Sequence, residues 1–174
     1  MKEHSTVHAI HHETDASSKL GGKYLTFTLA EEDYGISIKK VREIIGMMPV
    51  TKVPQTNAFM KGVINLRGKV IPVTDLRPRF GMEEIEYTDR TCIVIVEVVA
   101  TQGTVQMGII VDTVSEVLNI QEDDVESPPD LGAGNRTRYI LGMAKMEETA
   151  KILIDIDKVL GEDSLKELER VSKS

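Results

Sequence analysis

One stretch of this chain is repeated, and the repeat constrains the fold more than any other feature of the sequence. Residues 35–45 align without a gap on residues 108–118, where Gly35, Val41 and Glu43 match Gly108, Val114 and Glu116. Two further matches are weaker: 61–63 with 141–143, and 69–71 with 151–153. The matched segments therefore lie progressively further apart along the chain. A period of this length is too long for a solenoid and indicates two related subdomains with loop insertions.

Each copy has the composition and the periodicity of β-structure. Valine and isoleucine together number 35 of the 174 residues, and such stiff side chains suit a pleated, half-buried surface. Leu25, Phe27 and Leu29 alternate with more polar residues, which predicts a strand beginning at Lys23. About five short strands per copy, with turns at close spacing, are typical of a small barrel. Two barrels of about 70 residues would be marginal alone, so we expect them to share buried surface.

The chain divides into three parts. Residues 1–22 lack periodicity and are expected to form a disordered tail. The body spans 23–160, with the first barrel at about 23–88 and the second at about 89–160, and strand exchange between them is allowed. Residues 161–174 are expected to form a short C-terminal helix, because they contain a capping box and an apolar stripe that can pack on a barrel; the residues are Ser164, Leu165, Glu167, Leu168 and Val171.

The charge is unevenly distributed along the chain. The net charge is −7, but residues 39–80 carry nine Lys/Arg against two acids, and residues 82–130 carry twelve Asp/Glu against one arginine. This division indicates either two oppositely charged docking faces or solvated loops that happen to differ. An alternative function is a small-barrel nucleic-acid-binding protein that uses the basic 39–80 face, although aromatic side chains do not interleave with its Lys/Arg to stack bases.

The sequence does not look like that of an enzyme. All four histidines lie in the tail, so the body lacks the commonest general base and metal ligand; they are His4, His8, His11 and His12. Cys92 lies in an apolar strand, where a buried inert thiol is expected, and the glycines form no phosphate-cradling loop. Asp75 and Asp112 end strands, where turn and cap roles explain them. We therefore expect no catalytic residue, no metal and no cofactor.

The compartment follows from what is missing. Apolar runs fall short of the roughly 18 residues that a spanning helix needs, and the N-terminus lacks a signal-peptide core. A single cysteine cannot form an internal disulfide. These features predict a cytoplasmic protein.

Residues 62–76 contain the feature that points to function. Two β-branched runs flank Arg67-Gly68, where Gly68 can adopt the positive φ that a tight hairpin turn requires. A hairpin does not require a cation at its tip, and arginine normally sits where a carboxylate or a carbonyl array meets its planar donors. We expect Glu43 to form a partly buried ion pair with Arg67. Met47 and Met48 provide adaptable contacts, either in the core or with a partner.

These motifs resemble those of the CheW chemotaxis coupling family. The resemblance is carried by Tyr34-Gly35-Ile36, Val41-Arg42-Glu43-Ile44, Lys61 to Gly68 with its Asn-Leu-Arg-Gly turn, Ile71 to Leu76, and Gly108 to Leu118. It covers roughly residues 23–160, and the Asn-Leu-Arg-Gly hairpin is a specific motif.

The resemblance implies a fold and a function. The fold is all-β with short helices: two intertwined five-stranded SH3-like barrels that share a hydrophobic core. The function is that of an adaptor joining the cytoplasmic hairpin tip of membrane chemoreceptors to the regulatory domain of the histidine kinase CheA. Membrane association then comes only through receptors, and nucleic acid is not a partner.

The resemblance also implies site residues. The receptor contact or its support would involve Val41, Glu43, Gly62, Asn65 and Arg67, and a kinase contact would involve Asp130 and Leu131. Some relatives carry a base and an aromatic where this chain has Glu126 and Leu131.

Overall fold

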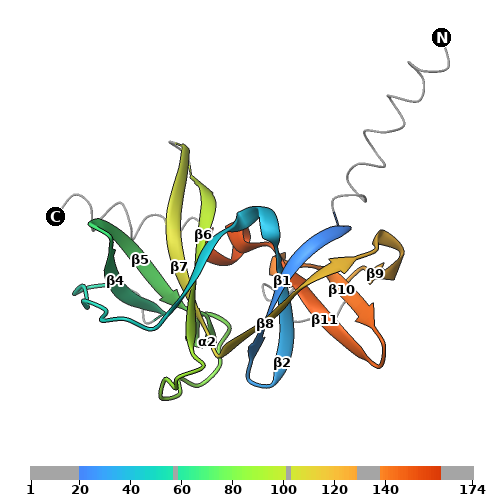
Figure 1. Cartoon of the computed structure of the whole chain (residues 1–174), viewed down its shortest axis with the longest axis horizontal. Helices are drawn as coiled ribbons and strands as arrows, with labels where there is room; N and C mark the ends of the chain where they lie inside the picture. The colour runs from blue at the N-terminus through green and yellow to red at the C-terminus, as the bar shows by residue number, and fades with distance from the viewer. Residues whose placement is uncertain (1–19, 57–58, 101–102, 129–137, 162–174) are drawn as a thin grey trace, which may run out of the picture.

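The structure is a computed structural model, and it describes residues 20–56, 59–100, 103–128 and 138–161 (Figure 1). Eleven strands lie within these ranges: β1 (Gly22–Leu29), β2 (Glu32–Ser37), β3 (Val41–Gly46), β4 (Met60–Leu66), β5 (Lys69–Asp75), β6 (Cys92–Ala100), β7 (Gly103–Val111), β8 (Thr113–Ile120), β9 (Val125–Glu126), β10 (Ile140–Met146) and β11 (Thr149–Ile154). The helical elements are short: η1 (Ile38–Lys40), α2 (Leu76–Arg79), η2 (Glu122–Asp124) and residues 156–161.

The strands form two sheets that lie side by side (Figure 1). One sheet has the order β3-β6-β7-β5-β4, and the other has the order β8-β1-β2-β11-β10-β9. We call them the first and the second sheet. Each contains antiparallel hairpins joined by one parallel contact, β5 with β7 and β11 with β2. The predicted fold class, two small barrels with short helices, is confirmed, except that the two-residue strand β9 gives the second sheet six strands.

The repeat explains how the two sheets are built. The first copy supplies β1 to β5 and the second copy supplies β6, β7, β8, β10 and β11. Each sheet takes the first two strands of one copy and the last three of the other. The expected boundary between residues 88 and 89 therefore does not separate the sheets, because both contain strands from each side of it. Strand exchange, which the expectation allowed, is reciprocal and involves four strands.

The structure also corrects the alignment of the two hairpins. Met60 pairs with Thr74 before a bulge at Gly62, and Ile140 pairs with Ile154 before a bulge at Gly142. At the tips, Leu66 pairs with Lys69 and Met146 pairs with Thr149. The structural equivalent of Lys69 is thus Thr149. The match of 69–71 with 151–153 was therefore wrong. It aligned Lys69 with Lys151 because both are lysines, whereas the strand pairing aligns Lys69 with Thr149.

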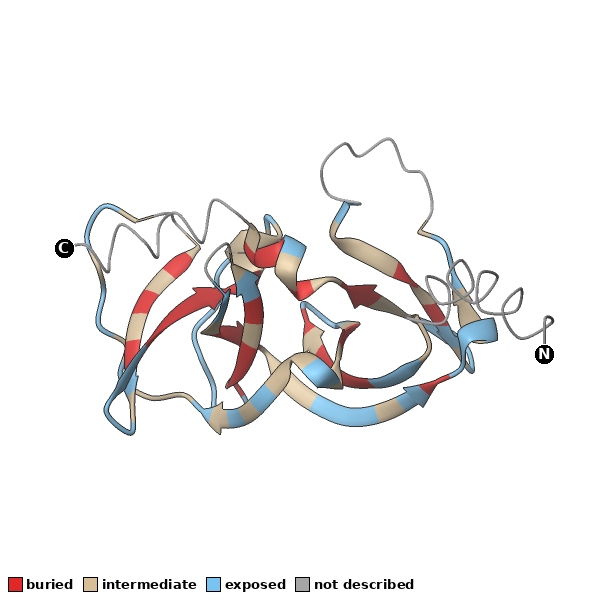
Figure 2. Ribbon diagram, turned by 90° about the horizontal axis from the view of Figure 1, so that it is seen from above, coloured by how far each residue is buried: buried red, intermediate tan, exposed pale blue. Residues whose placement is uncertain are grey.

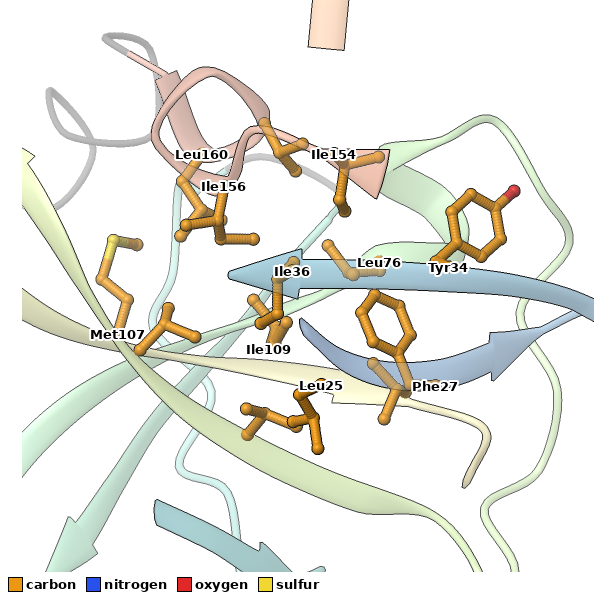
Figure 3. Packing of buried hydrophobic residues seen from close by; sticks show 14 of the residues in the cluster. Leu25, Phe27, Tyr34, Ile36, Leu76, Met107, Ile109, Ile154, Ile156 and Leu160 are labelled. Atoms are coloured by element: carbon orange, nitrogen blue, oxygen red, sulfur yellow. The ribbon is translucent and has the colours of Figure 1, made fainter. Parts of the chain in front are cut away.

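The core consists of three clusters, of which the largest lies between the sheets. Figure 3 shows Phe27 from β1, Ile36 from β2 and Ile109 from β7 packed together with Leu160 from the last helix, and all are at most 1% exposed. Burying each such side chain contributes about 1.5–3 kcal/mol. Each of the two smaller clusters is formed by buried residues of one sheet. In Figure 2 buried residues lie along strands of both sheets, whereas most exposed residues lie in the loops and at strand ends. The predicted shared core is confirmed.

The ends of the chain fall mostly outside the described residues. Of the expected tail at 1–22, only residues 20–22 are described, and Gly22 already begins β1. Of the expected helix at 161–174, only Gly161 is described, and it is helical together with residues 156–160. Asp155 caps that helix by accepting hydrogen bonds from the N–H groups of Asp157 (3.0 Å) and Lys158 (3.3 Å).

Candidate functional site

The site begins at the turn between β4 and β5. Arg67 and Gly68 have φ values of 52° and 86°, the two positive angles that define a type I′ turn. Gly68 adopts its angle without steric cost, and Arg67 does so under mild strain. The Asn65 side chain fixes the turn, because its Oδ1 accepts a hydrogen bond from the Gly68 N–H at 2.8 Å. The expected turn and the positive φ of Gly68 are both confirmed.

Arg67 meets the partner that the sequence predicts. Its Nη2 donates to Oε1 of Glu43, which lies on β3 at the opposite edge of the first sheet. This hydrogen bond and the negative charge of Glu43 raise the pKa of the Arg67 guanidinium. The side chains are 69% and 34% exposed, so the pair is not partly buried as expected; Arg67 projects into solvent because it occupies the tip of the turn. A surface pair of this kind contributes little to stability.

Gly62 and Val41 lie beneath this surface. A Cβ on Gly62 would lie 2.1 Å from the Thr51 carbonyl oxygen, and the φ of Gly62 is 147°. The missing side chain lets Thr51 and Val63 exchange two backbone hydrogen bonds of 2.8 and 2.9 Å. Val41 packs against the cluster between the sheets. These two residues support the site, whereas Glu43, Asn65 and Arg67 face outward.

Sequence reasoning missed one apolar residue beside the site. Ile44, next to Glu43 on the edge strand β3, is 43% exposed. Its neighbour Arg42 also points outward, where it binds both carboxylate oxygens of Glu97 at 3.0 and 2.8 Å. The signal was present in the sequence, because a charged residue within an apolar run indicates a solvent-facing side.

Other candidates have simpler roles. Met47 and Met48 pack against the cluster inside the first sheet, which favours the core interpretation. Cys92 is intermediate in exposure, and its thiol donates to the Arg90 carbonyl at 3.2 Å. Asp130 and Leu131 lie outside the described residues.

The two candidate carboxylates are structural. Asp75 caps α2 by accepting from the Arg77 N–H at 3.1 Å and also accepts from the Tyr87 hydroxyl at 2.9 Å. Burial raises the pKa of Asp75, and these hydrogen bonds only partly oppose the effect. Asp112 binds the Arg77 guanidinium through both oxygens. The expected cap role accounts for Asp75. The expected turn or cap role is wrong for Asp112, which instead forms an ion pair with Arg77 and accepts from the Ala30 N–H.

The structure also shows where the opposite charges of the two segments meet. Four cations from residues 39–80 form ion pairs with acids beyond residue 82: Lys40 with Asp157, Arg42 with Glu97, Lys61 with Glu84 and Arg77 with Asp112. Much of the basic segment is therefore neutralised within the fold. This favours internal complementarity over two opposed docking faces. Arg67 instead pairs with Glu43 from within the basic segment, and its side chain is 69% exposed.

Within the described ranges, His, Cys, Asp and Glu side chains do not gather into a group of three or more that could hold a metal ion. The four histidines are outside these ranges. The described helices are all too short to span a membrane.

Comparisons with known proteins identify relatives that match most of this chain. Residues 23–164 match the family model of the CheW-like domain. The chemotaxis protein CheW of Klebsiella aerogenes is 36% identical over 159 residues, which cover 91% of this chain and 93% of that protein. The CheW protein of Bacillus subtilis is 34% identical, covering 86% of this chain and 93% of that protein. The crystal structure of the scaffolding protein TtCheW from Thermoanaerobacter tengcongensis superimposes with a TM-score of 0.72 at 38% identity, covering 80% of this chain and 92% of that one.

Proposed function

The chain belongs to the CheW-like family of chemotaxis proteins, and from this premise we propose that it is a non-catalytic adaptor. It joins the cytoplasmic hairpin tip of membrane chemoreceptors to the regulatory domain of the histidine kinase CheA. In this role it acts in the cytoplasm, reaches the membrane only through receptors and does not bind nucleic acid.

The observation that carries the proposal is the presentation of Arg67. The guanidinium stands on a turn fixed by Asn65 and is oriented by a single hydrogen bond to Glu43. The rest of its planar donor array makes no hydrogen bond within the described residues, so it can bind a carboxylate or a row of carbonyl oxygens on a partner. Such groups are what the turn of a helical receptor hairpin offers.

The receptor contact combines this cation with apolar surface. Glu43, Asn65 and Arg67 form the polar part, and Ile44, which follows Glu43 on β3 and is exposed, supplies an apolar contact. Val41 and Gly62 hold the underlying strands in register. An apolar centre with a polar surround is the usual composition of a specific protein interface.

The kinase contact uses other parts of the molecule. The regulatory domain of the kinase is related to this chain, and we propose that the two pack barrel against barrel through the second sheet. A further contact falls on Asp130 and Leu131. Separate faces allow the adaptor to bind both proteins at once, and receptor control of the kinase then requires contacts that differ between two receptor states.

Reconstitution tests this function. The full chain is mixed with a receptor signalling fragment and CheA, and co-sedimentation and kinase autophosphorylation are measured with and without the adaptor. The proposal predicts that the kinase sediments with the receptor fragment and responds to it only when the chain is present. If the kinase is neither recruited nor regulated, the adaptor function is wrong. Strongly salt-dependent binding to single-stranded nucleic acid would instead support the alternative function.

A further inference from the structure

One ion pair joins the two sheets where the chain crosses from one to the other. Asp112 lies between β7 of the first sheet and β8 of the second. Its Oδ1 and Oδ2 accept from Nε and Nη2 of Arg77 at 2.8 and 2.7 Å, and Oδ2 also accepts from the Ala30 N–H at 2.9 Å. Arg77 belongs to α2, which follows β5 of the first sheet, and Ala30 lies in the β1–β2 turn of the second. We call this group the first bridge.

A second ion pair occupies the equivalent crossing. Lys40 lies between β2 of the second sheet and β3 of the first, and its Nζ is 2.6 Å from Oδ2 of Asp157. Asp157 belongs to the helix that follows β11, and its Oδ1 accepts from the Val99 N–H of β6 at 2.9 Å. We call this group the second bridge.

The two bridges are related by the internal repeat but have opposite polarity. Extending the structural alignment of the two hairpins places Arg77 on Asp157. The match of 35–45 with 108–118 places Asp112 on Lys39, the neighbour of Lys40. In the first bridge the crossing residue is the acid, whereas in the second it is the base. An ion pair thus joins the sheets at each of the two equivalent crossings, although the acid and the base exchange places.

The first bridge is the more rigid of the two. Its side chains are 14% and 21% exposed, against 29% and 30% in the second bridge. Arginine binds the carboxylate in a planar fork, while lysine makes a point contact that tolerates rotation. Burial alone would raise the pKa of Asp112, but the hydrogen bonds from Arg77 and Ala30 hold it below its usual value. The Arg77 Nη1 also donates to the Glu83 carbonyl at 3.1 Å, which leaves the guanidinium little freedom.

The position of Arg77 connects this bridge to the candidate site. Strand β5 begins two residues after Arg67 and ends two residues before Arg77. Its last five residues are buried, and the final three, Val73 to Asp75, pair with β7, whose last residue precedes Asp112. The hairpin tip is thus joined through β5 to Arg77, and through Asp112 to the β1–β2 turn of the second sheet, by a continuous series of covalent and hydrogen-bonded connections.

We propose that the first bridge is the positioning element that couples the Arg67 hairpin on the first sheet to the second sheet. This inference rests on the proposed function, in which receptor and kinase bind to different sheets. A partly buried ion pair of this kind adds little to stability but can fix one relative arrangement of the groups that it joins. Arg77 and Asp112 contact neither partner and set the orientation in which the two contact surfaces are held.

The test measures orientation and coupling in the same proteins. Spin labels are placed on cysteines at exposed Thr104 in the first sheet and exposed Glu148 in the second, with Cys92 changed to serine, and their distance distribution is recorded. Arg77→Gln is compared with Lys40→Gln as the matched control, and Asp112→Asn serves as the second variant should Arg77→Gln fail to fold. For each, binding to a receptor signalling fragment, binding to CheA and receptor-dependent kinase activity are measured separately.

The expected result is selective. Arg77→Gln should bind each partner as wild type does, broaden the distance distribution and lower receptor-dependent kinase activity by about fivefold or more. Lys40→Gln should change these quantities less. Unchanged kinase activity together with an unchanged distance distribution would overturn the inference, as would an equal effect of both variants. If wild type binds no receptor, the proposed function fails, and the distance distributions still decide whether the first bridge sets the orientation of the sheets.

Discussion

The β4–β5 and β10–β11 hairpins are two copies of one structure with opposite charge at their tips. Both contain the same bulge beside a glycine, Gly62 or Gly142, and both place a residue with positive φ at the turn, 52° at Arg67 and 56° at Glu147. The tip of the first hairpin is Arg67-Gly68, and that of the second is Glu147-Glu148. Both tips lie at the surface, but the cation and its Glu43 pair occur in the first only.

The difference separates structural requirements from specialisation. A feature that recurs in both copies is needed to build the hairpin, because the two copies share a backbone and not a partner. By this criterion Gly62, Val41 and Glu43 belong to the shared framework, because they match Gly142, Val114 and Glu116. Arg67 has no cationic counterpart and therefore reflects what the first hairpin contacts. The internal repeat thus serves as a control within one chain.

The largest expected effect comes from filling the space beside the bulge. Gly62→Ala should destabilise the protein by about 3 kcal/mol or more, because its Cβ would overlap the Thr51 carbonyl and its φ is unfavourable for L-residues. Gly142→Ala should cost about 1–2 kcal/mol, since its closest contacts are 2.6 Å to Val125 Cγ1 and 2.8 Å to the Glu126 oxygen. Urea unfolding midpoints measure both. The reverse order would refute the assignment of the two close approaches.

The next largest effect is expected at the two helix caps that follow the hairpins. Asp75→Ala should cost about 2 kcal/mol, because it removes the α2 cap and leaves the Tyr87 hydroxyl without its acceptor. Asp155→Ala should cost about 1 kcal/mol, the value of a cap alone. Thermal unfolding of the two variants provides the measurement, and equal losses would argue against a contribution from the Tyr87 contact.

The pH dependence of stability tests the burial of Asp75 separately. Its folded-state pKa lies above the unfolded value, so the folded protein holds the proton more tightly and the contribution of Asp75 to stability falls as pH rises through this window. Asp75→Asn keeps a cap oxygen but does not ionise. We expect the variant to gain stability relative to wild type as pH rises above about 4, up to the raised folded-state pKa. A difference that stays constant with pH would show that Asp75 titrates normally.

The smallest expected effect concerns the turn residues themselves. Gly68→Val should destabilise the protein by about 1 kcal/mol or more, because φ is 86° there although the space around the residue is open. Glu148→Val, at the equivalent position without a positive φ, should leave the unfolding midpoint unchanged. Equal midpoints for the two variants would contradict the type I′ assignment of the first turn.

The sequence predicted the hairpin, the positive φ of Gly68 and the partner of Arg67, because turn chemistry and ion pairing depend on a few local residues. It did not predict which sheet each strand joins. The repeat defines similar strands, but a strand such as β6 buries the same apolar residues whether it pairs within its own copy or in the other. The two hairpins were misaligned for a similar reason. Lys69 and Lys151 are identical residues, and the sequence does not contain the strand register that shows they are not equivalent.

The exposure of Arg67 was also beyond the sequence. A carboxylate within reach predicts an ion pair but not how exposed the pair is to solvent. That exposure depends on how far the turn extends past the edge of the sheet. The inter-sheet bridges were equally hidden, because Asp112 and Asp157 come close to their bases only after the strands are exchanged.

The central claim is that the cation on the first hairpin, and not the hairpin shape, recognises the receptor. The most direct measurement is the affinity of a receptor signalling fragment for Arg67→Glu and for Glu147→Arg, the charge reversals at equivalent positions of the two hairpins. Both variants should unfold at the wild-type midpoint, since both side chains are exposed. We predict that Arg67→Glu loses receptor binding while Glu147→Arg retains it. Wild-type affinity in Arg67→Glu, or an equal loss in both variants, would contradict this account.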